Sequence, residues 1–112
     1  WGHSKDYVNG MWLMMQQERA DDYVLATGET YTVRSFVERC FAKIGRDIIW
    51  EGKDTNEIGK DKVTGKIVVK INEKYFRPCE VDLLLGDPSK AVEKLGWIRQ
   101  YNLDTLIDDM FQ

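Results

Sequence analysis

The sequence predicts a mixed α/β lobe, and three observations lead to that prediction. Hydrophobic residues recur with helical and strand-like periods in the order helix, strand, helix, strand, strand, helix, helix. This order contains no uninterrupted βαβ run of the kind that builds a complete doubly wound domain. The chain has 112 residues, which is the size of one small domain. We therefore expect residues 1–112 to form a single lobe.

The first helix is expected to begin at Ser4, whose hydroxyl is a good N-cap. Four apolar residues follow at helical spacing and predict the face that packs into the core. They are Val8, Met11, Trp12 and Met15. The methionines allow a second interpretation, an adaptable binding surface, because their side chains are flexible and polarizable. We expect core packing.

The middle of the chain is expected to hold three strands and a second helix. Residues 22–29 (DYVLATGE) form an apolar run that ends at a glycine turn, which is typical of a short buried strand. Thr32 is the expected N-cap of the helix, and Gly45 is its expected stop. Residues 47–52 (DIIWEG) and 63–71 (VTGKIVVKI) are the next two strands, separated by a polar, lysine-rich loop. Thr64-Gly65 is the expected turn before the second of them. The apolar stripe of the helix consists of Val33, Phe36, Val37, Cys40, Phe41 and Ile44.

Two further helices are expected near the end of the chain. Asp87 caps the first of them, Pro88 occupies its first turn, and Gly96 ends it. Asn102 begins the second. The apolar residues of the two helices are Ala91, Val92, Leu95, Leu103, Leu106, Ile107, Met110 and Phe111.

Charge and composition narrow the classes of function. The net charge is −3, which disfavours general nucleic-acid binding, and no apolar run approaches the ~20 residues of a membrane span. From Lys53 to Arg77, however, seven basic residues stand against four acidic ones, so this segment carries a charge of +3. A local basic segment suits one phosphorylated small molecule, although a solvated loop has the same composition.

Metal and disulfide chemistry find little support in the sequence. Cys40 and Cys79 lack C-x-x-C spacing, and His3 is the single histidine, so we expect no metal site. Two cysteines can form one disulfide, but we expect both thiols to be free in a reducing cytoplasm. Cys40 lies on a helical apolar stripe and is expected to be buried and inert. His3 is expected to cap or pack.

The segment KYFRPCEVDLLLGDPSKAVEKLGW (74–97) holds the strongest candidate site. Arg77 presents a planar fork of donors that binds two phosphate oxygens at once, and Pro78 stiffens the chain after it. Glu80 could accept hydrogen bonds from the two adjacent hydroxyls of a ribose. The alternative is a salt bridge from Arg77 to Glu80 or Asp82, which needs no ligand.

Four stretches of the chain carry a resemblance to a known family. They are WGHSKDYVNGMW (1–12), YVLATGETYTVRSFVE (23–38), IIWEGK (48–53) and YFRPCEVDLLLGDPSKAVEKLGW (75–97). In order, they resemble the C-terminal part of the GDP-mannose 4,6-dehydratase family, which belongs to the extended short-chain dehydrogenases/reductases. The resemblance covers essentially the whole chain. It implies the mixed α/β, C-terminal substrate-binding lobe of an NAD(P)-binding Rossmann-type enzyme, with the Rossmann core largely absent from this chain.

The resemblance also implies an activity and a set of partners. Complete enzymes of this family use bound NADP to convert GDP-D-mannose to GDP-4-dehydro-6-deoxy-D-mannose, a precursor of GDP-fucose and other deoxyhexoses. Carried over by motif, Arg77 contacts the substrate diphosphate and Glu80 the ribose hydroxyls, while Asp82 is structural and Asp87 caps a helix. An N-terminal nucleotide-binding domain, a homo-oligomer in the full enzyme and a cytoplasmic location are implied as well. No nucleic acid or membrane partner is expected.

Catalysis itself is not expected from these residues. The family's Gly-rich cofactor turn, its catalytic Ser/Thr and its Tyr-x-x-x-Lys pair have no match, since no tyrosine of the chain is followed by lysine four residues later. Without that lysine the pKa of the tyrosine is not lowered for proton transfer. We expect a fragment of a longer enzyme that binds the GDP-sugar. The alternative is a free-standing binding or regulatory module without catalysis, and the sequence upstream of Trp1 separates the two.

Overall fold

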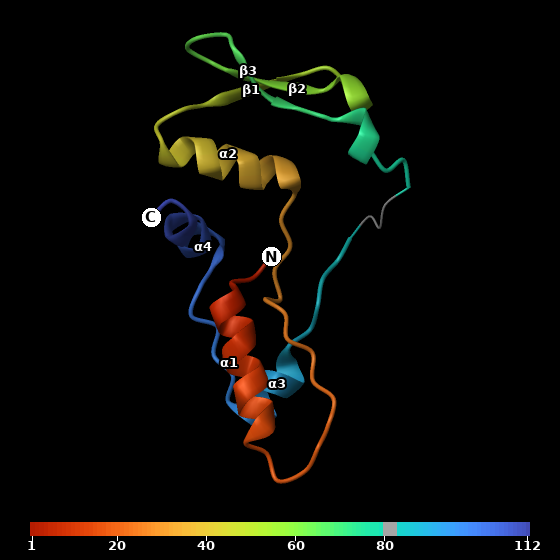
Figure 1. Cartoon of the computed structure of the whole chain (residues 1–112), viewed down its shortest axis with the longest axis vertical. Helices are drawn as coiled ribbons and strands as arrows, with labels where there is room; N and C mark the ends of the chain where they lie inside the picture. The colour runs from red at the N-terminus through yellow and green to blue at the C-terminus, as the bar shows by residue number, and fades with distance from the viewer. Residues whose placement is uncertain (80–82) are drawn as a thin grey trace. The chain divides into compact units, whose positions relative to one another are not determined.

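The structure is a computed structural model that describes residues 1–79 and 83–112 (Figure 1). The described residues form four α-helices and a three-stranded antiparallel sheet, so the predicted mixed α/β class is confirmed. The chain divides into two compact units. Unit 1 comprises Trp1–Tyr31 and Leu83–Gln112, and unit 2 comprises Thr32–Asp82. Along the described part of the chain, no helix is long and apolar enough to cross a membrane.

Unit 1 is built from three helices, which are α1 (Ser4–Met15), α3 (Ser89–Leu95) and α4 (Leu103–Met110). α1 and α3 lie side by side (Figure 1). The buried core cluster consists of Ala91, Leu95 and Trp97. Partly buried residues from α1 and from the segment after it pack against this cluster, namely Tyr7, Leu13, Met14, Tyr23 and Leu25. The core of unit 1 therefore joins residues that are far apart in the sequence.

The start and the orientation of α1 differ from the prediction. Its N-cap is His3 and not Ser4, because His3 Nδ1 accepts a hydrogen bond from the Lys5 amide at 3.0 Å. The predicted core stripe is wrong, since its four residues are between 57% and 81% exposed. The buried residues of α1 are instead Asp6 and Gly10. Both faces of the helix carry apolar side chains, so spacing alone does not identify the inner one.

Gly10 and Asp6 decide which face of α1 is buried. A Cβ at Gly10 would lie 2.7 Å from Leu25 Cδ1, so glycine is needed for this close approach. The Asp6 carboxylate accepts hydrogen bonds from the amides of Gln100 and Tyr101, each at 3.0 Å. A buried carboxylate is stable only with such partners. The hydrogen bonds of Asp6 thus place this face of α1 against the interior of unit 1.

Residues 22–29 do not form the predicted strand. The segment has no regular secondary structure. Its predicted burial is right in part, since Tyr23 and Leu25 pack against the core. The predicted glycine turn is confirmed by a φ of 71° at Gly28. The apolar run therefore reflects packing and not strand pairing, two causes that a short run does not separate.

The predicted start of α3 is wrong by one residue, and its predicted end and the start of α4 are confirmed. α3 begins at Ser89 with Pro88, and not Asp87, at the N-cap, although the Asp87 carboxylate accepts a hydrogen bond from the Ser89 amide at 3.0 Å. Gly96 ends α3 in the left-handed region, as predicted. Asn102 is the N-cap of α4, as predicted, and forms a capping box.

Unit 2 combines a helix, a small sheet and two 3-10 turns, which are α2 (Val33–Lys43), β1 (Ile48–Glu51), η1 (Asp54–Asn56), β2 (Ile58–Asp61), β3 (Ile67–Lys70) and η2 (Glu73–Tyr75). The strand order is β1-β2-β3, and both pairs are antiparallel. α2 lies beside the sheet (Figure 1). Its predicted ends are confirmed, because the Thr32 side chain caps it and Gly45 follows it with a φ of 74°.

The sheet contains a strand that the sequence analysis missed. β2 falls in the predicted lysine-rich loop, and its glycine and charged residues give a weak strand signal. In the structure Gly59 is buried, and a Cβ there would lie 3.0 Å from Ile48 Cγ2 and 3.1 Å from Val69 Cβ. The predicted strand in 63–71 is regular over Ile67–Lys70, and the turn predicted at Thr64-Gly65 is confirmed by a φ of 70° at Gly65.

Candidate functional site

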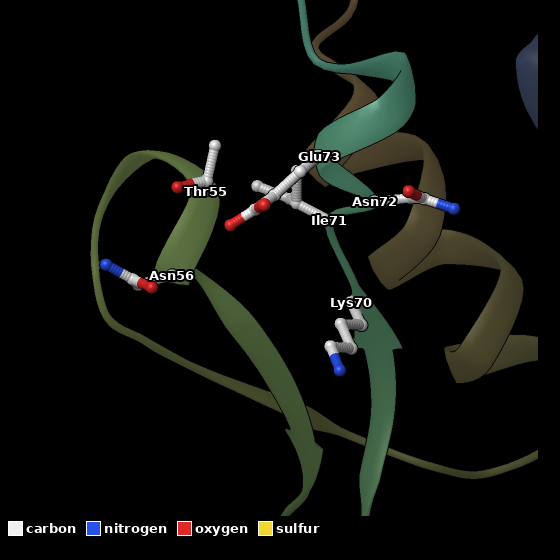
Figure 2. Close-up of a pocket in the computed structure, with 6 residues that line it drawn as sticks. All are labelled: Thr55, Asn56, Lys70, Ile71, Asn72 and Glu73. Atoms are coloured by element: carbon white, nitrogen blue, oxygen red, sulfur yellow. The ribbon is translucent and has the colours of Figure 1, made fainter.

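A hollow of about 640 Å³ lies at one end of the sheet in unit 2 (Figure 2). Two segments line it. Thr55 and Asn56 belong to η1, and four consecutive residues run from the end of β3 into η2. The four are Lys70, Ile71, Asn72 and Glu73. Since most of these side chains are polar and exposed, the hollow suits a polar ligand better than an apolar one.

The two turns that frame the hollow are held by local hydrogen bonds. In η1 the Asn56 amide donates to the Lys53 carbonyl at 3.0 Å, and Asp54 has a φ of 53°. In η2 the Asn72 side-chain oxygen accepts a hydrogen bond from the Lys74 amide at 3.0 Å. Asp and Asn favour such turns, because they tolerate positive φ and bond to the nearby backbone. The predicted polar loop therefore has a defined shape.

The side chains of the hollow differ in direction. Figure 2 shows Ile71 and Glu73 reaching from the β3–η2 segment toward Thr55. Asn72 points the other way, in agreement with its role as the cap of η2. A hydroxyl, a carboxylate and the Lys70 ammonium thus border the same hollow. Together these groups can donate to and accept from ligand hydroxyls, and the ammonium can pair with an anion.

Arg77 is the strongest candidate from the sequence, and it lies two residues after η2. Its side chain is exposed. The preceding Tyr75 and Phe76 are 71% and 40% exposed. Glu80, the second candidate, lies outside the described residues, as does Asp82. Arg77 follows the hollow-lining segment along the chain but is not among the residues that line the hollow. The roles of Arg77 and Glu80 stay predictions.

The lysines of the basic segment have different surroundings. Lys60 Nζ pairs with Glu51 Oε2 at 2.9 Å, across the ladder between β1 and β2. Lys74 Nζ lies 5.4 Å from the centroid of the Tyr75 ring. Lys70 lines the hollow and is therefore placed to meet an anionic group of a ligand there. The sequence alone left open which lysine has this position.

A second, apolar pocket of about 200 Å³ lies between α2 and the sheet. The Arg34 guanidinium carbon is 5.1 Å from the Trp50 ring centroid, and Arg34 also forms an ion pair with Glu57. The Trp50 indole donates a hydrogen bond to Glu38 at 2.8 Å. The apolar lining consists of Val33, Val37, Val69 and Ile71, with the Trp50 ring. Sequence reasoning missed this arrangement, because it depends on how α2 packs on the sheet.

Asp61 holds the turn between β2 and β3. It is 3% exposed, and its Oδ1 accepts hydrogen bonds from the amides of Val63 at 2.8 Å and Thr64 at 3.3 Å. Arg46 Nη1 lies 3.2 Å from its Oδ2. The two amides, and after them the Arg46 charge, lower the pKa of Asp61 below its ordinary value. Asp61 is therefore a structural carboxylate and a poor proton donor near neutral pH.

The single histidine is a structural residue, as predicted. His3 is 6% exposed and caps α1, and its Nε2 lies 2.9 Å from Asp109 Oδ2. Its ring stacks on Tyr101 with 4.0 Å between centroids. The hydrogen bond to His3 lowers the pKa of Asp109. In the part of the chain that the structure describes, no group of three or more His, Cys, Asp or Glu residues is placed to hold a metal ion.

The two cysteines are free thiols, as predicted. Cys40 is half-buried on α2, and this burial raises the pKa of its thiol. Since the thiolate is the reactive form, a raised pKa makes Cys40 a weak nucleophile. Cys79 is exposed and lies two residues after Arg77.

A loop contact that the sequence analysis missed joins the two segments of unit 1. The Arg99 guanidinium donates to both carboxylate oxygens of Glu29 at 3.1 Å and to the Thr27 carbonyl at 3.3 Å. The hydrogen bonds to Glu29 raise the pKa of Arg99. A bidentate pair of this kind fixes geometry as well as charge. Arg99 therefore holds the glycine turn of residues 27–29 in place.

Comparison with known proteins identifies the family. The family model described as GDP-mannose 4,6 dehydratase matches residues 1–110. The chain belongs to the GDP-mannose 4,6-dehydratase family. The match extends over both units and includes the segment that carries the hollow and Arg77. The resemblance inferred from the sequence motifs is thereby confirmed.

Three curated relatives show the degree of similarity. The chain is 54% identical over 112 residues to the GDP-mannose 4,6 dehydratase of Cricetulus griseus. This alignment covers 100% of this chain and 30% of that protein. It is 52% identical over 110 residues to the GDP-mannose 4,6 dehydratase of Homo sapiens. The same identity and length hold for the GDP-mannose 4,6-dehydratase of Sinorhizobium fredii. These two matches cover 98% of this chain, and 30% and 31% of the relatives. The chain thus spans about 30% of the length of the curated relatives that it matches.

Proposed function

We propose that this chain is the substrate-binding lobe of a GDP-mannose 4,6-dehydratase and that it binds the GDP-sugar. The observation that carries the proposal is the family match over residues 1–110. In the proposed complete enzyme, GDP-D-mannose is converted to GDP-4-dehydro-6-deoxy-D-mannose with bound NADP in the cytoplasm. The two free thiols agree with that location. Residues 1–112 then serve as the C-terminal lobe of an extended short-chain dehydrogenase/reductase.

NADP is proposed to bind outside these 112 residues. A dinucleotide site of this enzyme class needs a βαβ unit with a glycine-rich turn. The described sheet is instead antiparallel, and the sequence has no G-x-G-x-x-G motif. The residues present do not fit the cofactor, so we derive no chemical step from them. An N-terminal nucleotide-binding domain is the proposed partner, in a homo-oligomeric full enzyme, and the 112-residue chain alone is expected to be inactive.

Within the lobe, we assign the substrate diphosphate to Arg77 and the ribose hydroxyls of the GDP moiety to Glu80. Three features support Arg77: its side chain is exposed, its guanidinium matches two phosphate oxygens, and it follows the hollow along the chain. Lys70 adds a second cation beside hydroxyl-binding groups. The assignment of Glu80 depends on its place three residues after Arg77 in the R-P-x-E motif.

A chimeric enzyme tests the proposed function directly. In it, the matching segment of the Cricetulus griseus dehydratase is replaced by this chain, which aligns over all 112 residues. We expect the chimera to bind GDP-mannose in titration calorimetry and to convert it with NADP. A folded chimera that neither binds nor converts GDP-mannose would refute the proposal.

Arg77→Ala in the chimera is expected to weaken GDP-mannose binding by about 1–3 kcal/mol, because a charge-assisted hydrogen bond is lost. Titration calorimetry measures the change. Lys62→Ala is the matched control, since Lys62 is an exposed cation of the same basic segment that does not line the hollow. If both variants bind GDP-mannose as tightly as the parent, the diphosphate assignment is wrong.

Glu80→Gln is expected to weaken binding of GDP-mannose by about 1 kcal/mol, because the amide replaces a charged acceptor of ribose hydroxyls. A 2′-deoxyribose analogue has already lost one of these hydroxyls, so its affinity should fall less. The measurement is the pair of dissociation constants for each protein. Equal losses for the two ligands would remove the ribose role of Glu80.

A further inference from the structure

The apolar pocket of about 200 Å³ between α2 and the sheet takes no part in the proposed binding of GDP-mannose. A glycine in the middle strand decides its shape. Gly59 pairs with Trp50 of β1 and with Val69 of β3, so the three residues form one row across the sheet. A Cβ at Gly59 would lie 3.1 Å from Trp50 Cζ3. The Trp50 ring therefore packs against the sheet at Gly59 and forms one wall of the pocket.

The pocket combines short branched side chains with two planar groups. The Arg34 guanidinium carbon lies 5.1 Å from the centroid of the Trp50 ring, and both residues line the pocket. Aromatic rings gain energy beyond area burial from other rings and from guanidinium groups, whereas aliphatic rings do not. An aromatic ring is therefore favoured over an aliphatic ring of the same size. The branched residues of the lining are Val33, Val37, Val69 and Ile71.

Volume and charge restrict the kind of ring further. A drug-sized ligand needs about 300–1,000 Å³, whereas an apolar cavity of about 150 Å³ holds benzene. A pocket of about 200 Å³ thus suits one ring or two fused rings. Arg34 pairs with Glu57 at the pocket, and Glu38 accepts a hydrogen bond from the Trp50 indole at 2.8 Å. Since two carboxylates and one guanidinium lie there, an anionic ring is disfavoured.

We propose that this pocket binds a small, uncharged aromatic ring and that the site is separate from that of the GDP-sugar. The guanine base does not suit the pocket, because polar atoms surround the base and the valines would leave them without hydrogen bonds. Among the described residues, Ile71 is the one that lines both the pocket and the hollow. The proposal does not depend on the proposed function.

Phenol is the probe, and it is titrated into the 112-residue chain and into the chimera with the Cricetulus griseus dehydratase. Cyclohexanol is the matched aliphatic ring, and benzoate is the matched anionic ring. We expect phenol to bind with a dissociation constant below about 10 mM, about threefold or more tighter than cyclohexanol, and benzoate not to bind in that range. At about ten times its dissociation constant, phenol should slow hydrogen exchange of β2 and β3 peptides about tenfold and leave α3 and α4 peptides unchanged.

Variants that fill the pocket locate the bound ring. Val37→Phe should weaken phenol binding more than about tenfold, because the new side chain occupies the space of the ligand. Val33→Phe repeats the test at a lining residue that is 69% exposed, where a larger side chain is compatible with folding. Val63→Phe is the control and should leave the affinity unchanged, since Val63 is 90% exposed and does not line the pocket. Hydrogen exchange of β2 and β3 peptides shows whether each variant is folded.

The outcomes separate the proposal from its alternatives. Phenol that binds neither protein, or that keeps its affinity for every folded variant at Val33 and Val37, overturns the proposal. Equal affinities for phenol and cyclohexanol overturn it as well, because the site then has no preference for an aromatic ring. Displacement of phenol by excess GDP-mannose in the chimera shows that the two sites are one, which also overturns it. If phenol binds as expected to a chimera that does not bind GDP-mannose, the aromatic-ring site stands and the proposed function fails.

Discussion

The two units of the chain are stabilised by different kinds of contact. In unit 1, Trp97 is buried and its indole donates to the Asp6 carbonyl at 2.8 Å, across 91 positions of sequence. His3 and Asp109 are linked across 106 positions. In unit 2 each strand pairs with the next along the chain, and no residue of α2 is buried. Unit 1 is thus held together by contacts between residues far apart in the sequence, whereas the sheet of unit 2 is formed by strands that follow one another along the chain.

This difference bears on where a ligand site is found. Local hairpins and exposed ion pairs each contribute little to stability, whereas a buried cluster contributes cooperatively. The hollow lined by Lys70 and Glu73 lies in unit 2, the unit with the less buried interior. Binding segments are commonly drawn from regions of low local stability. We therefore expect ligand binding to stabilise unit 2 more than unit 1.

The largest expected effect comes from replacing one tryptophan in each unit. Trp97 is 2% exposed, so Trp97→Ala should reduce the free energy of unfolding of unit 1 by about 3–5 kcal/mol. Trp50 is half-buried, and Trp50→Ala should cost unit 2 about 1–2 kcal/mol. Hydrogen exchange read by mass spectrometry measures each unit separately. Equal losses would contradict the comparison, as would a loss of protection by Trp97→Ala in unit 2 alone.

A smaller effect is expected from the buried acid of unit 1. Asp6→Ala leaves the amides of Gln100 and Tyr101 without their acceptor, which should destabilise unit 1 by about 2–3 kcal/mol. Asp6→Asn keeps one acceptor oxygen and should lose less. Glu93→Ala is the control, because Glu93 is exposed on α3. Urea unfolding gives the three values, and an Asp6→Ala variant as stable as the control would show that these hydrogen bonds do not hold the unit.

The elements that could be predicted from the sequence are those whose signals are local. Thr32, Asn102 and Gly96 were identified as helix ends, because a cap depends on one side chain and the adjacent backbone. The inner face of α1 could not be chosen in this way. It is decided by the partners of Asp6, which lie more than ninety positions away. Periodicity shows that a face is apolar and not what it packs against.

The candidate site likewise has a part that the sequence predicts and a part that only the fold shows. Arg77 was found from its residue type, its proline neighbour and its motif, all of which are visible in the sequence. The hollow was not found, because it requires the η1 turn and the end of β3 to come together through the unpredicted strand β2. Gly59 carried a signal of that strand, since a glycine in a sheet marks close packing, but a single glycine is also typical of a loop.

The smallest expected effect concerns acid and belongs to unit 2. The pKa of Asp61 is lowered in the folded state by the amides of Val63 and Thr64. A carboxylate with a lowered folded pKa stabilises the protein above its unfolded pKa of about 3.9, and this contribution is lost as the pH falls toward the folded value. Asp61→Asn should therefore reduce the stability of unit 2 at pH 6 and flatten its loss between about pH 4 and pH 2.

Unit 1 provides the internal control for this pH effect. Its stability should keep the acid dependence of the parent chain, because Asp109 still gains from the His3 hydrogen bond there. The measurement is the hydrogen-exchange protection of β2 and β3 peptides against α3 and α4 peptides at each pH, corrected for intrinsic exchange. If Asp61→Asn changes the pH profile of both units equally, the units unfold together and their separate stabilisation is refuted. If it changes neither, the turn between β2 and β3 is held without the Asp61 charge.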